Sequence, residues 1–115
     1  MTKEYDLEER TEKYAKNVIQ LCKKLAQNTI NFELIEQVVS ASGSVGANYI
    51  EANEALSKKD FFHRIKICRK ESKESRYWLR LIVSANSTCE KEASPLIQES
   101  TELMNIFGAI LKKNT

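Results

Sequence analysis

The residues of this chain best suited to binding chemistry are basic side chains gathered between positions 57 and 86. This segment holds nine basic and three acidic residues, a net charge of +6, whereas the whole chain carries only +2. Clustered lysines and arginines are typical of surfaces that bind nucleic-acid phosphates. The candidate phosphate-binding residues are Lys58, Lys59, Arg64, Lys66, Arg69, Lys70, Lys73, Arg76 and Arg80.

His63, Tyr77 and Trp78 lie among these charges and could stack on exposed bases. The competing interpretation is a solvated helix face, partly neutralised by segment 28–56, which has four acidic residues and no basic ones. Glu71 and Glu74 interrupt the basic run. Composition alone therefore favours the solvated face.

Signs of a catalytic or zinc site are weak. His63 is the only histidine, and the three cysteines, Cys22, Cys68 and Cys89, form no Cys-x-x-Cys pair. Cys68 follows His63 by five residues, a spacing that places the two on different faces of a helix. We expect Cys68 to be a core residue, and we expect no enzyme activity and no cofactor.

Two acidic pairs are spaced so that each shares one helix face, Glu51 with Glu54 and Glu71 with Glu74. Carboxylates on facing helices bind di-iron centres in bundles, but those sites also use Glu-x-x-His motifs. No histidine follows any of these acids by three residues. Pairing with Arg or Lys of a neighbouring helix or subunit is the favoured interpretation, and no metal site is predicted.

Helices must position these residues. Apolar residues recur at alternating steps of three and four along four segments, and the chain has only three Gly and one Pro. The pattern predicts an all-α fold, an antiparallel up-down-up-down, left-handed four-helix bundle in one domain over 1–115. The expected helices span 6–27, 31–56, 58–86 and 90–113.

The seam of the third helix is expected at Phe61, Ile65, Cys68, Ser72, Ser75, Leu79 and Ile82. The seam of the second helix is expected to reach Leu56. Small residues over 40–47 predict close packing between the second and third helices, with serine hydroxyls bonding back to helix carbonyls.

Local residues mark the helix boundaries. Asn28 to Asn31 and Ser57 with Asp60 are typical of N-caps. The fourth helix has two possible starts, one near Ser87 to Glu90 and one at Pro95, and the sequence does not choose between them.

Tyr77 and Trp78 are adjacent, so both cannot face the core of one monomer. With Leu81 they form an apolar edge that favours self-association. The polar N-terminus does not resemble a signal peptide, and no apolar run approaches the ~18 residues of a membrane span. With three cysteines that suggest no disulfide framework, we expect a cytoplasmic protein without membrane contact.

Three runs carry a family resemblance. Residues 44–52 read Ser-Val-Gly-Ala-Asn-Tyr-Ile-Glu-Ala, residues 57–61 read Ser-Lys-Lys-Asp-Phe, and residues 71–79 read Glu-Ser-Lys-Glu-Ser-Arg-Tyr-Trp-Leu. The chain thereby resembles the bacterial four-helix-bundle proteins of the 23S rRNA intervening-sequence type, also labelled a ribosomal-protein family. Residues assigned to the family motif, to packing or to an interface are Gly46, Asn48, Tyr49, Glu51, Phe61, Glu71, Glu74, Tyr77 and Trp78.

The resemblance implies a non-enzymatic bundle that assembles into rings, typically homopentamers. Some members are encoded within insertions in large-subunit rRNA genes. Related bundles are accessory proteins of diversity-generating retroelements, which engage nucleic acid and a reverse transcriptase. Two hypotheses follow: an oligomer that binds RNA or DNA phosphates through its third helix, or a protein-interaction scaffold whose basic helix is used in subunit or partner contacts.

Overall fold

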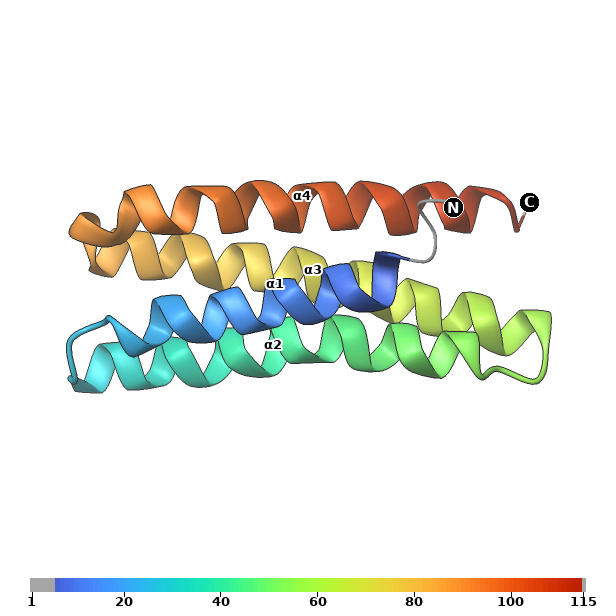
Figure 1. Cartoon of the computed structure of the whole chain (residues 1–115), viewed down its shortest axis with the longest axis horizontal. Helices are drawn as coiled ribbons and strands as arrows, with labels where there is room; N and C mark the ends of the chain where they lie inside the picture. The colour runs from blue at the N-terminus through green and yellow to red at the C-terminus, as the bar shows by residue number, and fades with distance from the viewer. Residues whose placement is uncertain (1–5, 115) are drawn as a thin grey trace.

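The computed structural model describes residues 6–114, which form four long helices (Figure 1). A short 3-10 turn, η2, covers Ser87–Cys89 just before the last helix. The predicted all-α class is confirmed. The helices are α1 (Asp6–Lys23), α2 (Thr29–Asn53), α3 (Lys58–Ala85) and α4 (Glu90–Lys112).

Successive helices run in opposite directions, with the α1–α2 and α3–α4 connections at one end and the α2–α3 connection at the other (Figure 1). The bundle measures 44 × 26 × 21 Å. Its long axis matches α3, whose 28 residues span about 42 Å at 1.5 Å per residue. Of the four pairs of neighbouring helices, α2–α3 packs most extensively and α1–α4 least. The predicted left-handed sense stays a prediction.

The core follows the predicted seams closely. On α3 every expected seam residue from Ile65 to Ile82 is buried, and Phe61 is half-buried. Large side chains from the other helices, such as Tyr14, Val45 and Phe107, fill the centre. The prediction for Leu56 was wrong, because α2 ends at Asn53 and Leu56 lies in the connection to α3, 99% exposed.

The helix starts match the predicted capping chemistry. The side chain of Asn28 accepts a hydrogen bond from the backbone N–H of Asn31 at 2.8 Å, and Ser57 Oγ accepts one from Asp60 at 3.0 Å. α1 ends at Lys23, four residues earlier than expected.

The helical segment α4 starts at Glu90, the earlier of its two possible positions, and Pro95 lies inside it. Burial of Cys89 and Ala93 accounts for this start, because both side chains join the core only if the chain is already folded onto it there. Two acids in the first turn, Glu90 and Glu92, complement the helix dipole.

An amide bridge joins the start of α2 to the end of α3. Asn31 is buried, and its side-chain amide donates to Asn86 Oδ1 at 3.0 Å while Asn86 donates back to Asn31 Oδ1 at 2.8 Å. The Asn31 amide also donates to the carbonyl of Ala26 at 2.8 Å. The α1–α2 connection is thereby tied to the C-terminal end of α3.

The predicted close packing of α2 on α3 agrees with their extensive contact, and within the small-residue segment Gly46 also packs against α1. A Cβ atom on Gly46 would lie 2.9 Å from Thr11 Oγ1, so the absence of a side chain lets α1 approach α2. The predicted return of serine hydroxyls to helix carbonyls is confirmed at Ser72, which donates to Cys68 O at 2.8 Å. Within residues 6–114 the buried hydroxyl of Ser75 has no hydrogen-bond partner.

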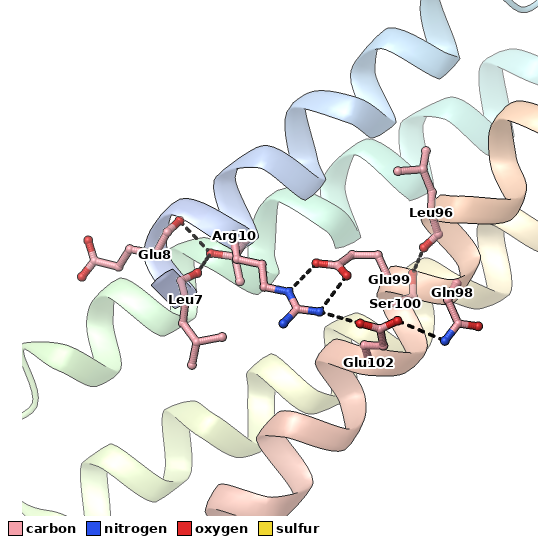
Figure 2. A network of polar contacts seen from close by, with 9 residues as sticks. Leu7, Glu8, Arg10, Leu96, Gln98, Glu99, Ser100 and Glu102 are labelled. Carbon is pink, nitrogen blue, oxygen red and sulfur yellow. Dashed lines mark hydrogen bonds and ion pairs between the residues drawn. The ribbon is translucent and has the colours of Figure 1, made fainter. Parts of the chain in front are cut away.

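The neighbouring pair with the least extensive contact, α1 and α4, is joined by a charged cluster (Figure 2). Arg10 donates from Nε and Nη2 to the two carboxylate oxygens of Glu99 at 2.7 and 2.9 Å, and from Nη2 to Glu102 at 2.8 Å. Gln98 donates to the other oxygen of Glu102 at 3.1 Å. Deeper in the bundle, the hydroxyls of Tyr14 and Ser100 lie 2.5 Å apart and link the same two helices.

Candidate nucleic-acid interface

The outward side of α3 carries one continuous row of exposed side chains. Its members recur at alternating steps of four and three, so they share one helix face. Each lies two residues before a seam residue, which places the row opposite the core. From first to last the row spans about 32 Å at 1.5 Å per residue. This row, called the basic stripe below, consists of Lys59, His63, Lys66, Lys70, Lys73, Tyr77 and Arg80.

The other four predicted basic residues lie beside the stripe. Lys58 and Arg69 are exposed. Arg64 and Arg76 are half-buried and hold neighbouring helices: Arg64 donates to Asn48 Oδ1 of α2 at 3.0 Å, and Arg76 donates to Thr101 Oγ1 of α4 at 3.2 Å. The nine candidates therefore divide into seven exposed cations and two cations that contact other helices.

The basic residues of α3 form no ion pair with the acidic second helix within residues 6–114. Among the ion pairs of residues 6–114, a basic residue of α3 takes part in one, Lys70 Nζ with Glu71 of its own helix at 4.0 Å. Neither Glu33 nor Glu51, nor any other acid of α2, pairs with α3 in this part of the chain.

The four glutamates with paired spacing do not form one cluster. Glu71 is half-buried, and its burial, with a smaller contribution from Glu74, raises the pKa of its carboxyl. Glu51 and Glu54 are exposed near the α2–α3 connection, beside a hollow of about 330 Å³ that Arg64 also lines. Within the described residues no three His, Cys, Asp or Glu side chains are placed to hold a metal ion.

The adjacent aromatic residues of α3 have different surroundings. Tyr77 is 57% exposed on the stripe, whereas Trp78 is half-buried and packs against the core. Their rings meet edge to face with centroids 5.1 Å apart. The expected apolar edge is thus divided, because only Tyr77 offers a largely open ring.

His63 and Cys68 lie apart, as their spacing predicted. His63 is exposed on the stripe, while Cys68 is fully buried and its thiol donates to the carbonyl of Val45 at 3.4 Å. Burial raises the pKa of Cys68 to about 12. Near neutral pH this thiol is protonated and cannot act as a thiolate nucleophile.

The motif residues of α2 and the start of α3 make packing contacts. Asn48 accepts from Arg64 and donates to Ser44 O at 2.9 Å. Tyr49 is buried, with its ring centroid 6.0 Å from that of Phe107. Phe61 is half-buried against the core and contacts Phe62 edge to face at 5.1 Å.

The fold agrees with the comparisons with known proteins. The family model described as 23S rRNA-intervening sequence protein matches residues 3–109. The chain belongs to this family. The resemblance predicted from the sequence is therefore confirmed.

Among solved structures, the chain is similar to a protein of unknown function from the S23 ribosomal protein family of Bacteroides thetaiotaomicron. The two share 28% sequence identity and superpose with a TM-score of 0.83, covering 91% of this chain and 97% of the other. The comparison with curated proteins finds no match. This intervening-sequence family member therefore shares its bundle with a relative of nearly equal length.

Sequence reasoning named every residue of the basic stripe but not its arrangement as one row, and it missed the exposed apolar side chains of α2 in this family member. The stripe could have been found, because it is the α3 seam shifted by two residues. Exposed apolar side chains on α2, Phe32 and Ile50 among them, carried a weaker signal, since they simply lie off the predicted seam.

None of the helices described between residues 6 and 114 has the length and hydropathy needed to span a membrane.

Proposed function

We propose that this protein is a non-enzymatic homo-oligomer that binds RNA or DNA phosphates through the basic stripe, without reading a base sequence. The supporting observation is the row of five exposed cations on the face of α3 opposite the core, with no acid of α2 paired to it within residues 6–114. The three free, buried cysteines support a reducing, cytoplasmic location.

The stripe suits phosphate contacts better than base readout. Four of its five cations are lysines, compact charges that attract phosphate without fixing a bidentate geometry. Its ~32 Å length exceeds the spacing of several phosphates, which follow each other every ~3.4 Å along one duplex strand. Tyr77 adds an aromatic face on which an unpaired base can stack.

The affinity of the protein for a labelled duplex should fall steeply with salt. If all five cations displace counterions, the slope of log K against log[salt] is about −4.5, or roughly a 500-fold loss between about 50 and 200 mM salt. Fluorescence anisotropy measures this slope directly. A salt-independent affinity would contradict phosphate binding.

Charge reversal locates the contact. The triple variant Lys66→Glu, Lys70→Glu, Lys73→Glu should lose duplex and single-strand binding by more than about 100-fold, because attraction becomes repulsion over the centre of the stripe. The matched control Lys13→Glu, Lys23→Glu, Lys91→Glu changes the net charge equally at exposed positions on α1 and α4. Equal losses in both variants would mean that net charge, rather than the stripe, governs binding.

Self-association is proposed through a second surface. On α2, four residues recur at steps of seven, four and seven: Phe32, Val39, Gly43 and Ile50, called the α2 apolar row below. Phe32 and Ile50 are 58% and 49% exposed. Gly46, which contacts α1, is three residues after Gly43 and four before Ile50, so the row lies on the α1 side of α2. Subunits joined there leave the stripe uncovered.

A further inference from the structure

A groove runs along the line where the first half of α3 meets the last half of α4. Its first part, a hollow of about 470 Å³, is lined mainly by α3, including Lys58, Lys59 and Lys66. Its second part, of about 610 Å³, is lined mainly by α4, together with Arg69. Leu111 lines both parts, so the two hollows adjoin at this residue. We call these two adjoining hollows the α3–α4 groove.

The charge of the α3–α4 groove has one sign. Among the described residues that line it, five are basic and none is acidic. Of these five, Lys59 and Lys66 also belong to the basic stripe, so the stripe forms one wall of the groove. Within residues 6–114 no ion pair involves the four cations that α3 contributes. The basic lining residues are Lys58, Lys59, Lys66, Arg69 and Lys112.

The remaining lining is largely apolar. Phe62, Met104 and Leu111 are half-buried, so each keeps part of its surface in the groove. Gly108 leaves space between them and Arg69: a Cβ atom there would lie 3.8 Å from Arg69 Nε, at ordinary contact distance. A basic rim over an aromatic and aliphatic lining matches a ligand that is anionic along one edge and flat and apolar along another.

We propose that the α3–α4 groove binds a short single-stranded segment of RNA or DNA, with its phosphates against the lysines and its bases against Phe62 and the apolar lining. This inference rests on the proposed function and narrows it. In a duplex the bases are stacked inside the helix and cannot reach such a lining, whereas the bases of a single strand are free to do so. The basic lining attracts the backbone, and the apolar lining selects the unpaired strand.

The decisive variant is Gly108→Leu, which fills the groove without altering any charge. Leucine is a better helix former than glycine, so the variant is expected to fold. Its matched control is Asn17→Leu on α1, an exposed and uncharged position that lines neither part of the groove and lies outside the α2 apolar row. Circular dichroism and thermal unfolding of both variants establish that the helices remain.

Binding is measured by fluorescence anisotropy with four labelled probes of equal charge: oligothymidylate, oligouridylate, an abasic strand and a duplex. Wild-type protein should bind the two base-bearing single strands about tenfold or more tightly than the abasic strand, since each stacked base contributes to affinity. Gly108→Leu should lose about tenfold for those two strands and keep its duplex affinity. Asn17→Leu should match the wild type on every probe.

The outcomes separate the groove from the stripe. If Gly108→Leu binds the single strands as the wild type does, or if the abasic strand binds equally well, the groove assignment is wrong while the stripe still stands. If polyglutamate competes as effectively as the oligonucleotides, the groove is a general site for acidic chains and the nucleic-acid assignment is wrong. If the wild type binds no probe, the proposed function itself fails, and the groove assignment with it.

Discussion

Two glycines three residues apart on α2 show how one missing side chain can have opposite consequences. Gly46 lies against α1, where a Cβ atom would be only 2.9 Å from Thr11 Oγ1 and 3.3 Å from Thr11 Cβ. At Gly43 a Cβ atom would meet nothing within 4 Å. Glycine in a helix costs about 1 kcal/mol of stability relative to alanine. At Gly46 the missing side chain allows closer packing of α1 on α2, whereas at Gly43 it brings no such contact.

Alanine substitutions at the two glycines should therefore shift stability in opposite directions. Gly43→Ala should raise the free energy of unfolding by about 0.5–1 kcal/mol. Gly46→Ala should lower it by about 1–3 kcal/mol, because α1 must move to relieve the overlap with Thr11. Urea unfolding measures both. Adding Thr11→Ala to Gly46→Ala should recover part of the loss, and a stabilising Gly46→Ala would show that the α1 contact is easily adjusted.

The buried cysteines should make the protein sensitive to alkali. Burial raises the pKa of Cys22 to about 11 and that of Cys68 to about 12, from a reference value of 9.0. Above about pH 9 the unfolded chain loses these protons while the folded chain retains them, so folding stability falls as pH rises. Each thiol contributes up to about 1.4 kcal/mol per pH unit.

Urea unfolding at several pH values between about 8 and 10.5, with reductant present, measures this slope. Cys68→Ala should make the fall of the unfolding free energy with pH less steep by up to about 1.4 kcal/mol per pH unit, which corresponds to one proton. This change is expected whatever the effect of the variant on stability near neutral pH. An unchanged slope in the variant would show that ionisation of Cys68 does not contribute to the alkaline loss.

At the scale of the elements, the contact between α1 and α4 depends on few groups. The Arg10 cluster joins these helices with two hydrogen bonds to Glu99 and one to Glu102 (Figure 2). Glu99 is partly shielded, its side chain 24% exposed, and planar two-point pairing with Arg is among the stronger ion pairs. This pair is less exposed than an ordinary surface pair such as Lys16 with Glu12, whose side chains are 69% and 64% exposed.

A double-mutant cycle on Arg10→Ala and Glu99→Ala should give a coupling energy of about 1 kcal/mol at low salt, falling in about 1 M salt. The same cycle on Lys16 and Glu12 provides the comparison, with an expected coupling of about 0.3–0.5 kcal/mol. Chemical unfolding of the four proteins in each cycle supplies the energies. Equal couplings would mean that the two-point geometry adds nothing measurable.

The extent to which sequence predicted the elements follows from how local each signal is. The seams and the caps at Asn28 and Ser57 were predictable because periodicity and capping depend on residues a few positions apart. Leu56 fitted the period but lay beyond the end of α2, since a period does not mark where a helix stops. The amide bridge between Asn31 and Asn86 joins residues 55 positions apart, which no local pattern encodes.

The candidate site was predictable in composition but not in arrangement. The nine basic residues of α3 were identified from the sequence, but the half-buried positions of Arg64 and Arg76 depend on Asn48 and Thr101 of other helices. The α3–α4 groove was not predicted at all. It requires Gly108 to lie opposite Arg69, which only the pairing of α3 with α4 establishes.

For the whole molecule, the basic stripe and the α2 apolar row lie on different helices: the stripe is on the outward face of α3, and the row is on the α1 side of α2. If subunits associate through the row, burial of Phe32 and Ile50 drives assembly, and the oligomer should persist at high salt. Light scattering across a salt series tests this. An oligomer that dissociates as salt rises would favour the scaffold hypothesis, in which the stripe pairs with acids of a neighbouring subunit.

Substitution on the row provides the second test. The double variant Phe32→Glu, Ile50→Glu should be monomeric, because two charges cannot be buried at that contact without partners. Ile30→Glu is the matched control: Ile30 is 64% exposed on the same helix but lies off the row. Size-exclusion chromatography with light scattering gives the masses, and a monomeric control together with an oligomeric double variant would place the contact elsewhere.

The offset of two residues between the stripe and the α3 seam has a consequence for how substitutions accumulate. Between positions 59 and 82, tolerance measured by folding and tolerance measured by binding should oscillate with the same helical period but nearly half a turn out of phase. Substitutions at a position such as Leu79 would affect folding alone, whereas substitutions at the next position, Arg80, would affect binding alone. The helix could thus acquire a new ligand preference through substitutions at residues that do not pack in the core.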